Sequence, residues 1–177
     1  EDKLLQAQGE ERPDPAGLAP TEQLAEVARR MHELVERQHA CLQKEIEPAL
    51  RKGGIRRLRI EELSAAQLQH VEALFEDFIF PVVSPVAVEP GGEFPLLAGL
   101  ALALHVRLEA APDAGGSRHA LVAMPRGLAR FLTLPGEAGF AYVLLEDVVR
   151  AYAGRLFPGV KVLECTAFRL TRNADMS

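Results

Sequence analysis

The sequence contains no tryptophan and few other aromatic residues, which make up only 6% of its 177 residues. A surface that binds single-stranded nucleic acid uses aromatic side chains on which the bases stack, so this composition argues against one. There are only two cysteines, Cys41 and Cys165, and neither has a second cysteine or a histidine at the spacing of a zinc site. We expect both to be reduced, mostly buried thiols of a cytosolic protein.

An excess of positive charge is also absent, because the formal net charge is −5. Nucleic-acid binding driven by overall charge is therefore disfavoured. The longest apolar run, Phe94–Leu104, is too short to span a bilayer, and the polar, proline-rich residues 1–20 do not form a secretory signal. The chain starts without Met and ends without a terminal signal, so we expect it to be part of a longer protein.

Familiar catalytic motifs are missing as well. The sequence has no phosphate-binding loop, no dinucleotide-binding glycine motif, no Gly-x-Ser-x-Gly elbow and no Cys-x-x-Cys pair. Gly91-Gly92-Glu93-Phe94 only superficially resembles the signature of cyclic-dinucleotide synthases, since that signature needs a further acidic residue before its aromatic. The residues alone nominate no nucleophile, no general base and no metal ligand.

The most informative stretch that is present is Phe80–Pro95, which contains four prolines. Apolar residues recur with a helical period before it and mostly alternate after it, so the helical part must end at Phe80. On composition alone, an interdomain connector is favoured over a functional loop. Its valines nevertheless indicate an extended segment, which we expect at the edge of a sheet because proline has no N–H to donate to a neighbouring strand.

Before this stretch we expect a flexible lead-in over residues 1–20 and a helical region over 21–80. Thr21 predicts a helix start, Pro48 a kink or restart, and Gly53-Gly54 the helix end. Ser64 to Gln67 fits a capping box that opens a second helix. We expect the two helices to pack as an antiparallel pair.

After it, residues 81–177 predict a mostly antiparallel sheet with at least one packed helix. Leucine and valine alternate with small or polar residues over 100–108, which is typical of a strand. A turn at 112–117 predicts a hairpin, extended segments are expected at 131–134, 140–144 and 160–172, and Glu146-Asp147 opens a helix. The predicted fold class is α+β.

Histidine and arginine clusters give only weak signals of function. His32, Glu36 and His39 share a helix face, but a solvated face is favoured over a metal site, and His105 is expected on a strand surface. His70 and His119 have no partner that the sequence identifies. Two basic groups remain. The first, which we expect to be a solvated surface, is Arg51, Lys52, Arg56, Arg57 and Arg59. The second group consists of Arg150, Arg155, Lys161, Arg169 and Arg172. Its guanidinium groups could bind phosphate oxygens, but charges on the solvent-exposed face of a strand are the favoured interpretation.

An ordered series of short blocks resembles the bacterial polyphosphate kinase family from about Leu18 to the end of the chain. The blocks are Glu45-Ile46-Glu47-Pro48-Ala49-Leu50, Gly54-Ile55, Phe80 to Val88, Phe94-Pro95, Arg130 to Pro135, Leu145-Glu146-Asp147-Val148, Leu156-Phe157-Pro158-Gly159 and Phe168 to Asp175. No single block is specific to this family, but the order and spacing of the blocks are.

The resemblance implies the late N-terminal helical domain and the first part of a head domain. It implies a parent enzyme that reversibly transfers the terminal phosphate of ATP to polyphosphate, with Mg²⁺, through a phosphohistidine in later domains. This segment would then be a non-catalytic scaffold for dimerisation and channel shaping. A cytoplasmic location is implied, with peripheral association with the inner membrane left open. Candidate phosphate contacts are Arg130, Arg169 and Arg172.

Some positions depart from the family pattern. Ser84 stands where threonine is usual, Glu89 where aspartate is usual, and Gly92-Glu93 where a His-Pro pair is usual. A non-catalytic adaptor or assembly module of a divergent relative is therefore the alternative function. A third hypothesis is an anion-binding module that uses Arg169 and Arg172 for nucleic acid.

Overall fold

The computed structural model describes residues 17–89, 91–92, 94–110, 118–136 and 139–170. The chain divides into two compact units between Gly53 and Gly54. We describe each unit by itself.

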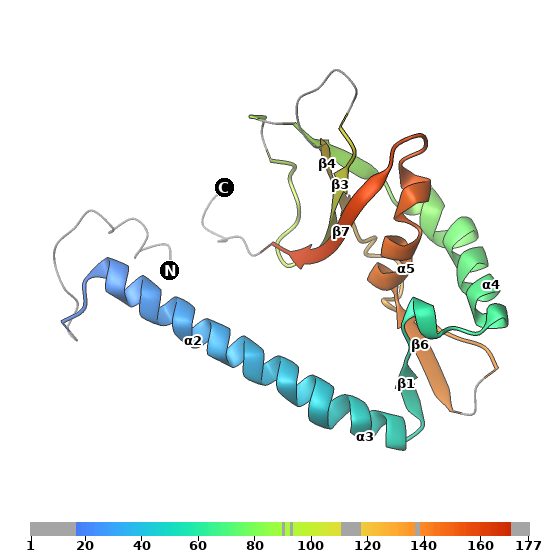
Figure 1. Ribbon diagram of the computed structural model, residues 1–177, viewed down its shortest axis with the longest axis horizontal. Helices are drawn as coiled ribbons and strands as arrows, with labels where there is room; N and C mark the ends of the chain where they lie inside the picture. Colours follow the sequence, from blue (N-terminus) through green and yellow to red (C-terminus); the bar gives the residue numbers. More distant parts are fainter. Residues whose placement is uncertain (1–16, 90, 93, 111–117, 137–138, 171–177) are drawn as a thin grey trace. The chain divides into compact units, whose positions relative to one another are not determined.

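The described part of the first unit is one helical run, drawn from blue to teal in Figure 1. It consists of α2 (Pro20–Cys41), a π-helical turn (Leu42–Ile46) and α3 (Glu47–Lys52). The prediction that Thr21 caps the helix is wrong, because Pro20 already occupies the first turn and Ala19 is the cap residue. Its N–H donates to the Glu22 carboxylate at 2.9 Å.

The sequence predicted either a kink or a restart of the helix at Pro48. The structure shows a restart, in which α3 follows a π-helical turn. Pro48 has no N–H to donate to a carbonyl four residues earlier, so the regular hydrogen-bond pattern cannot continue through it. The N–H of Glu47 instead donates to the carbonyl of Leu42, five residues back, and α3 begins with Pro48 in its first turn.

Acid is expected to weaken α2 through Glu26. The side-chain hydrogen bonds from Arg29 and Arg30 lower the pKa of Glu26 to about 2 from 4.5. Because the folded-state pKa is depressed, this stabilisation is present above pH 4.5 and is lost as the pH falls through about 2. We expect circular dichroism at 222 nm to show less acid-induced loss of helix in Glu26→Gln than in the parent chain, and the difference to shrink at high salt. An identical acid profile in the two proteins would contradict this.

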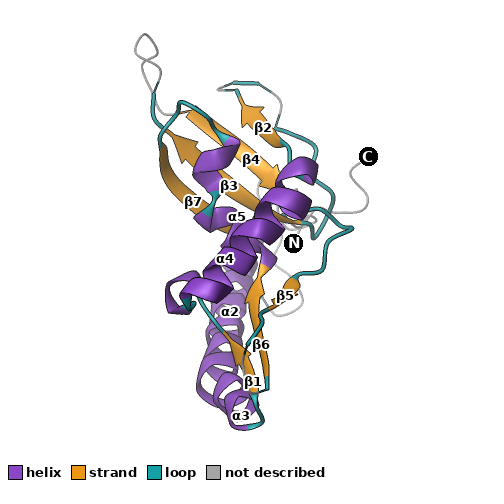
Figure 2. Cartoon of the chain, turned by 90° about the vertical axis from the view of Figure 1, so that its right-hand side faces the viewer, coloured by secondary structure: helices purple, strands orange, loops and turns teal. Residues whose placement is uncertain are grey.

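The second unit contains two sheets (Figure 2). The smaller has the order β1-β6-β5, in which β1 (Ile55–Arg57) runs parallel to β6 (Phe140–Leu144), and β5 (Phe131–Thr133) is antiparallel to β6. The larger is antiparallel, with the order β2-β4-β3-β7. Its strands are β2 (Pro85–Val88), β3 (Leu102–Leu108), β4 (Arg118–Ala123) and β7 (Val162–Arg169).

The alternating pattern of β3 places its leucines as predicted. Leu104, Val106 and Leu108 join the main core, whereas Ala103 lies on the other face with Leu97 and Leu121 in a smaller cluster. Both faces of the strand are therefore partly covered. The turn predicted at 112–117 lies outside the described residues.

The helices of this unit are α4 (Ala65–Leu74), which continues through a π-helical turn (Phe75–Ile79), and α5 (Leu145–Ala151). Short 3₁₀ turns follow at Phe80–Val82 and Ala153–Leu156, and another precedes α4 at Ile60–Glu62. The Ser64 capping box is confirmed, since Ser64 and Gln67 each accept the other's backbone N–H. In Figure 1, α5 lies between the larger sheet and α4.

The predicted α+β class is confirmed, with one parallel pair, β1 and β6, among antiparallel strands. We expected α4 to belong to a helical region over residues 21–80. In the structure, Val71 and Phe75 of the α4 segment instead belong to the core of the second unit. The antiparallel pairing of the two helices stays a prediction. The edge strand expected within Phe80–Pro95 is confirmed, because β2 pairs with β4 at the edge of the larger sheet, and the connector favoured on composition alone is not what this segment forms.

Candidate anion-binding site around helix α5

Two adjacent carboxylates open α5 and organise the charged groups around it. Glu146 and Asp147 are only 6% and 8% exposed. Carboxylates are favourable in the first turn of a helix, but burying them is costly unless cations and hydrogen-bond donors lie against them. Each of the two is in fact paired with arginine.

Glu146 binds Arg130 through two donors of one guanidinium. Arg130 Nε lies 2.9 Å and its Nη2 2.5 Å from the same carboxylate oxygen. These hydrogen bonds raise the pKa of Arg130, more than burial lowers it. The carbonyl of Arg130 also accepts the N–H of Leu145 at 2.8 Å, so its backbone and side chain are both fixed to the start of α5.

Asp147 holds two arginines, one on each carboxylate oxygen. Arg57 Nη2, from β1, donates at 3.0 Å, and Arg150 Nη2, one turn further along α5, donates at 2.8 Å. Such charge-assisted hydrogen bonds fix the guanidinium orientation as well as its position. The first turn of α5 therefore positions three arginines.

A hollow of about 150 Å³ lies beside Glu146, and we call it the arginine hollow. Arg126, Arg130 and Arg169 line it together with Glu146, so its charged groups carry a positive excess. Its remaining lining is largely apolar: Ala101, Leu102, Met124, Pro125, Leu128 and Leu145. Planar guanidinium groups next to an apolar wall suit the binding of phosphate oxygens.

The structure brings together two of the three predicted phosphate contacts. Arg169 ends β7 opposite Leu102 of β3, and Arg130 precedes β5. Arg172 lies outside the described residues. The sequence interpretation missed Arg126, whose only signal was its place in a Pro-Arg-Gly turn four residues before Arg130.

Other predicted groups have ordinary partners. His32 Nδ1 lies 2.7 Å from the carbonyl of Ala28 on an exposed helix face. Among the described residues, no three of the His, Cys, Asp and Glu side chains form a cluster that could hold a metal ion. His105 and His119 lie on adjacent strands with their ring nitrogens 2.9 Å apart, a pairing that the sequence did not reveal.

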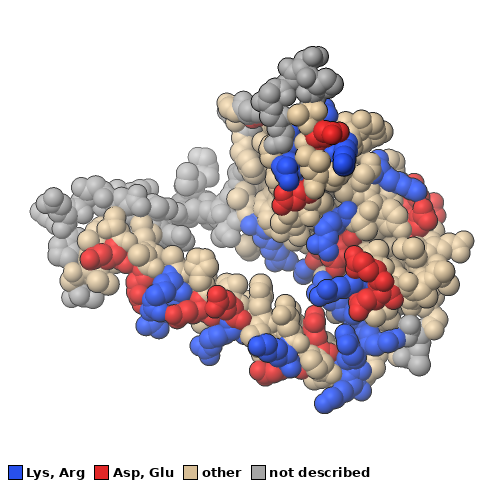
Figure 3. Space-filling view, viewed as in Figure 1, with Lys and Arg blue, Asp and Glu red and all other residues tan. Residues whose placement is uncertain are grey.

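The two basic groups differ from our expectations in their partners. Arg57, expected on a solvated surface, pairs with buried Asp147. Arg155 of the second group pairs with Glu72 and Glu76 of the α4 segment, so carboxylates far away in the sequence neutralise it. Figure 3 shows acidic and basic side chains interspersed along α2, consistent with the pairs that Glu26 makes with Arg29 and Arg30.

With this geometry in place, comparison with known proteins assigns the chain. Residues 2–58 match the polyphosphate kinase N-terminal domain, and residues 66–177 match the polyphosphate kinase middle domain. The chain belongs to the polyphosphate kinase family. The resemblance found in the sequence is thereby confirmed.

Curated relatives in this family include the polyphosphate kinases of Bacillus anthracis and Streptomyces coelicolor. The first is 37% identical over 166 residues, covering 92% of this chain and 24% of the relative. The second is 41% identical over 162 residues, covering 91% of this chain and 21% of the relative. The chain thus spans less than a quarter of the length of these relatives.

A solved structure has the same fold. The crystal structure of polyphosphate kinase from Porphyromonas gingivalis superposes with a TM-score of 0.74 at 24% identity, over 88% of this chain and 25% of that chain. Within the residues that our structure describes, no helix is both long and apolar enough to cross a membrane.

Proposed function

We propose that the protein containing this chain is a polyphosphate kinase that reversibly transfers the terminal phosphate of ATP to polyphosphate. Family membership over most of the chain supports this proposal. In the proposed reaction a phosphohistidine forms in domains outside this chain, and Mg²⁺ and ATP act there. The described residues offer no cluster suited to a metal ion, so we assign Mg²⁺ no ligand in them.

We assign this chain a scaffold role in dimerisation and channel shaping, with no catalytic residue of its own. We further propose that this chain contacts polyphosphate directly. The arginine hollow supports this role, because Glu146 fixes Arg130 there beside Arg126 and Arg169. A polyanion passing this surface would meet Arg130 already held in place by Glu146, so this side chain would need little ordering on binding. Arg130, Arg169 and Arg172 are the proposed phosphate contacts, in a cytoplasmic enzyme.

The activity is tested on the longer protein that contains this chain. With labelled ATP and Mg²⁺ it should give an acid-labile phosphoprotein and labelled polyphosphate. The chain alone should give neither, and serves as the matched control. If the longer protein also gives neither product, the kinase proposal fails and a non-catalytic adaptor becomes the better explanation.

The dimerisation role is tested separately. Sedimentation velocity of the chain should show a dimer at micromolar concentrations, and the same measurement on residues 1–53 should not. A chain that remains monomeric at every concentration would contradict the proposed scaffold role while leaving the activity of the longer protein unaffected.

A further inference from the structure

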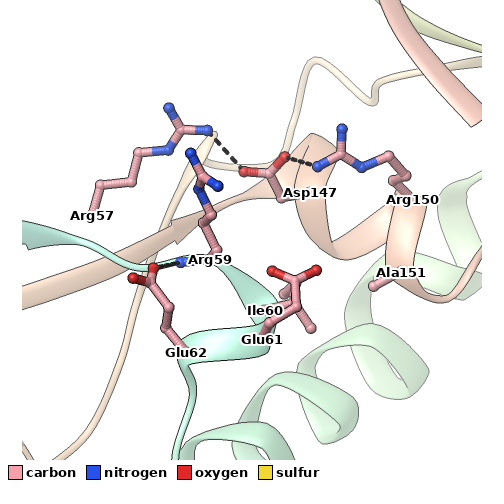
Figure 4. A pocket seen from close by; sticks show the side chains of 8 residues that line it. All are labelled: Arg57, Arg59, Ile60, Glu61, Glu62, Asp147, Arg150 and Ala151. Atoms are coloured by element: carbon pink, nitrogen blue, oxygen red, sulfur yellow. Dashed lines mark hydrogen bonds and ion pairs between the residues drawn. The ribbon is translucent and has the colours of Figure 1, made fainter. Parts of the chain in front are cut away.

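The charged side chains around Asp147 neutralise one another. Figure 4 shows the Asp147 carboxylate between the guanidinium groups of Arg57 and Arg150, and it accepts a hydrogen bond from each. The cavity beside it is lined by three guanidinium groups and three carboxylates, those of Arg57, Arg59, Arg150, Glu61, Glu62 and Asp147. These charges balance, so the cavity has no positive excess for an anion. The side chains whose chemistry is still unassigned are two imidazoles on the larger sheet.

His105 and His119 lie on the face of the larger sheet that is turned away from the main core. The neighbours of His105 along β3 are buried in that core, so its own side chain points to the opposite face. Where β3 pairs with β4, His105 is opposite Leu121 and His119 is opposite Arg107. The two histidines are therefore diagonal neighbours on adjacent strands. Both are partly exposed, so a dissolved ion can reach them.

The two imidazole rings meet nitrogen to nitrogen. Nε2 of His105 lies 2.9 Å from Nδ1 of His119, the ring planes are inclined by 16°, and the ring centroids are 5.1 Å apart. One proton between the nitrogens makes an N–H···N hydrogen bond. A divalent metal ion that replaces this proton needs each ring to tilt slightly, so that both lone pairs point at the metal, and the proton is released to solvent.

The distance between the nitrogens indicates which coordination geometry fits. Imidazole nitrogens bind divalent transition metals at about 2.0–2.1 Å, so two of them at right angles around one metal lie about 2.9 Å apart. In a tetrahedral complex they lie about 3.3 Å apart. The observed 2.9 Å therefore suits the right-angled coordination of Ni²⁺ or Cu²⁺ better than the tetrahedral coordination of Zn²⁺.

The neighbouring charged groups compensate each other. Arg107, opposite His119, forms a salt bridge with Glu164 at 3.2 Å, so its charge is not left to repel a metal ion. Thr166, opposite His105 on β7, donates to the other oxygen of the Glu164 carboxylate at 3.5 Å. Among the described residues, no third His, Cys, Asp or Glu forms a metal-binding cluster with the pair, so water must supply the remaining ligands.

We propose that His105 and His119 form a bidentate site for a divalent transition-metal ion of the Ni²⁺ or Cu²⁺ type. The ligand atoms are Nε2 of His105 and Nδ1 of His119, and water molecules complete the coordination. The bound metal joins β3 to β4 and so stabilises the larger sheet. The site shares no residue with the arginine hollow, and imidazole ligands do not suit Mg²⁺, so it is independent of the proposed phosphate transfer.

The test is isothermal titration calorimetry of the 177-residue chain, without an affinity tag, with Ni²⁺ and separately with Mg²⁺. One Ni²⁺ should bind per chain, and Mg²⁺ should not bind. His105→Gln and His119→Gln should each weaken Ni²⁺ binding at least about tenfold, because one imidazole alone cannot chelate the ion. The matched control is His32→Gln combined with His39→Gln, which removes two imidazoles from the exposed face of α2. It should change the Ni²⁺ affinity less than about twofold.

A second measurement needs no variant and so does not depend on how the substitutions fold. Six-coordinate Ni²⁺ is paramagnetic, so a small amount should broaden the ring-proton NMR signals of His105 and His119 before those of His32, His39 and His70. Saturating Ni²⁺ should also raise the unfolding temperature of the parent chain. Absence of Ni²⁺ binding at millimolar concentration, equal weakening in the α2 control, or simultaneous broadening of all the histidine signals would overturn the site.

Discussion

Replacing Gly139 by alanine is expected to lower the free energy of unfolding by about 3 kcal/mol or more. A Cβ at this position would lie 2.3 Å from the carbonyl oxygen of Gly54, and the backbone has φ +100°. That same oxygen accepts the N–H of Phe140 at 2.8 Å, where β1 begins to pair with β6. The clash is with backbone, so relief requires moving the strand. Equilibrium denaturation in urea measures the loss.

Gly136→Ala is the matched control for the clash. Gly136 also has a positive φ, +80°, but a Cβ there would have nothing within 4 Å. It should therefore lose only the conformational cost of a left-handed alanine, about 1 kcal/mol. Equal losses in the two variants would show that the close approach of Gly139 to Gly54 is not what constrains this pairing.

Replacing Phe75 by alanine is the second large expected loss, about 3–5 kcal/mol in the free energy of unfolding. Phe75 is fully buried, and its ring stacks on Tyr152 with the centroids 4.8 Å apart. It joins the α4 segment to the end of α5 within the main core. Alanine would leave a cavity among residues from several elements, which close-packed neighbours can only partly fill.

Phe78→Ala, three residues further along the same turn, is the control. Phe78 is 60% exposed, so its truncation should cost less than about 1 kcal/mol. Phe75 lies on the buried face of this segment, whereas Phe78 lies on its exposed face. A Phe78 loss as large as that of Phe75 would mean that this face is covered in solution.

Local patterns predicted most of the second unit. Alternation identified β3, the capping box identified the start of α4, and the valines identified β2 as an edge strand. The parallel pairing of β1 with β6 could not be predicted, because β1 has only three residues, Ile-Arg-Arg, without a distinctive pattern. Its partner is set by the close approach of Gly54 to Gly139, a contact across more than eighty residues.

The candidate site was predictable only in its residue types. Arg130 and Arg169 were chosen from their residue type and position, and the structure places both at one hollow. Glu146 and Asp147 were recognised only as a helix start. Their arginine partners could not be inferred, because Arg57 and Asp147 are 90 residues apart and no local periodicity links them.

The measurement that tests the central claim most directly is polyphosphate affinity after neutralising the proposed contacts. The chain carrying Arg130→Gln, Arg169→Gln and Arg172→Gln should bind polyphosphate at least about tenfold more weakly than the parent chain. A control with equal charge loss at Arg30, Arg37 and Arg107 should change the affinity less than about threefold. Unchanged affinity in the first variant, or equal weakening in both, would contradict a phosphate-binding role for the arginine hollow.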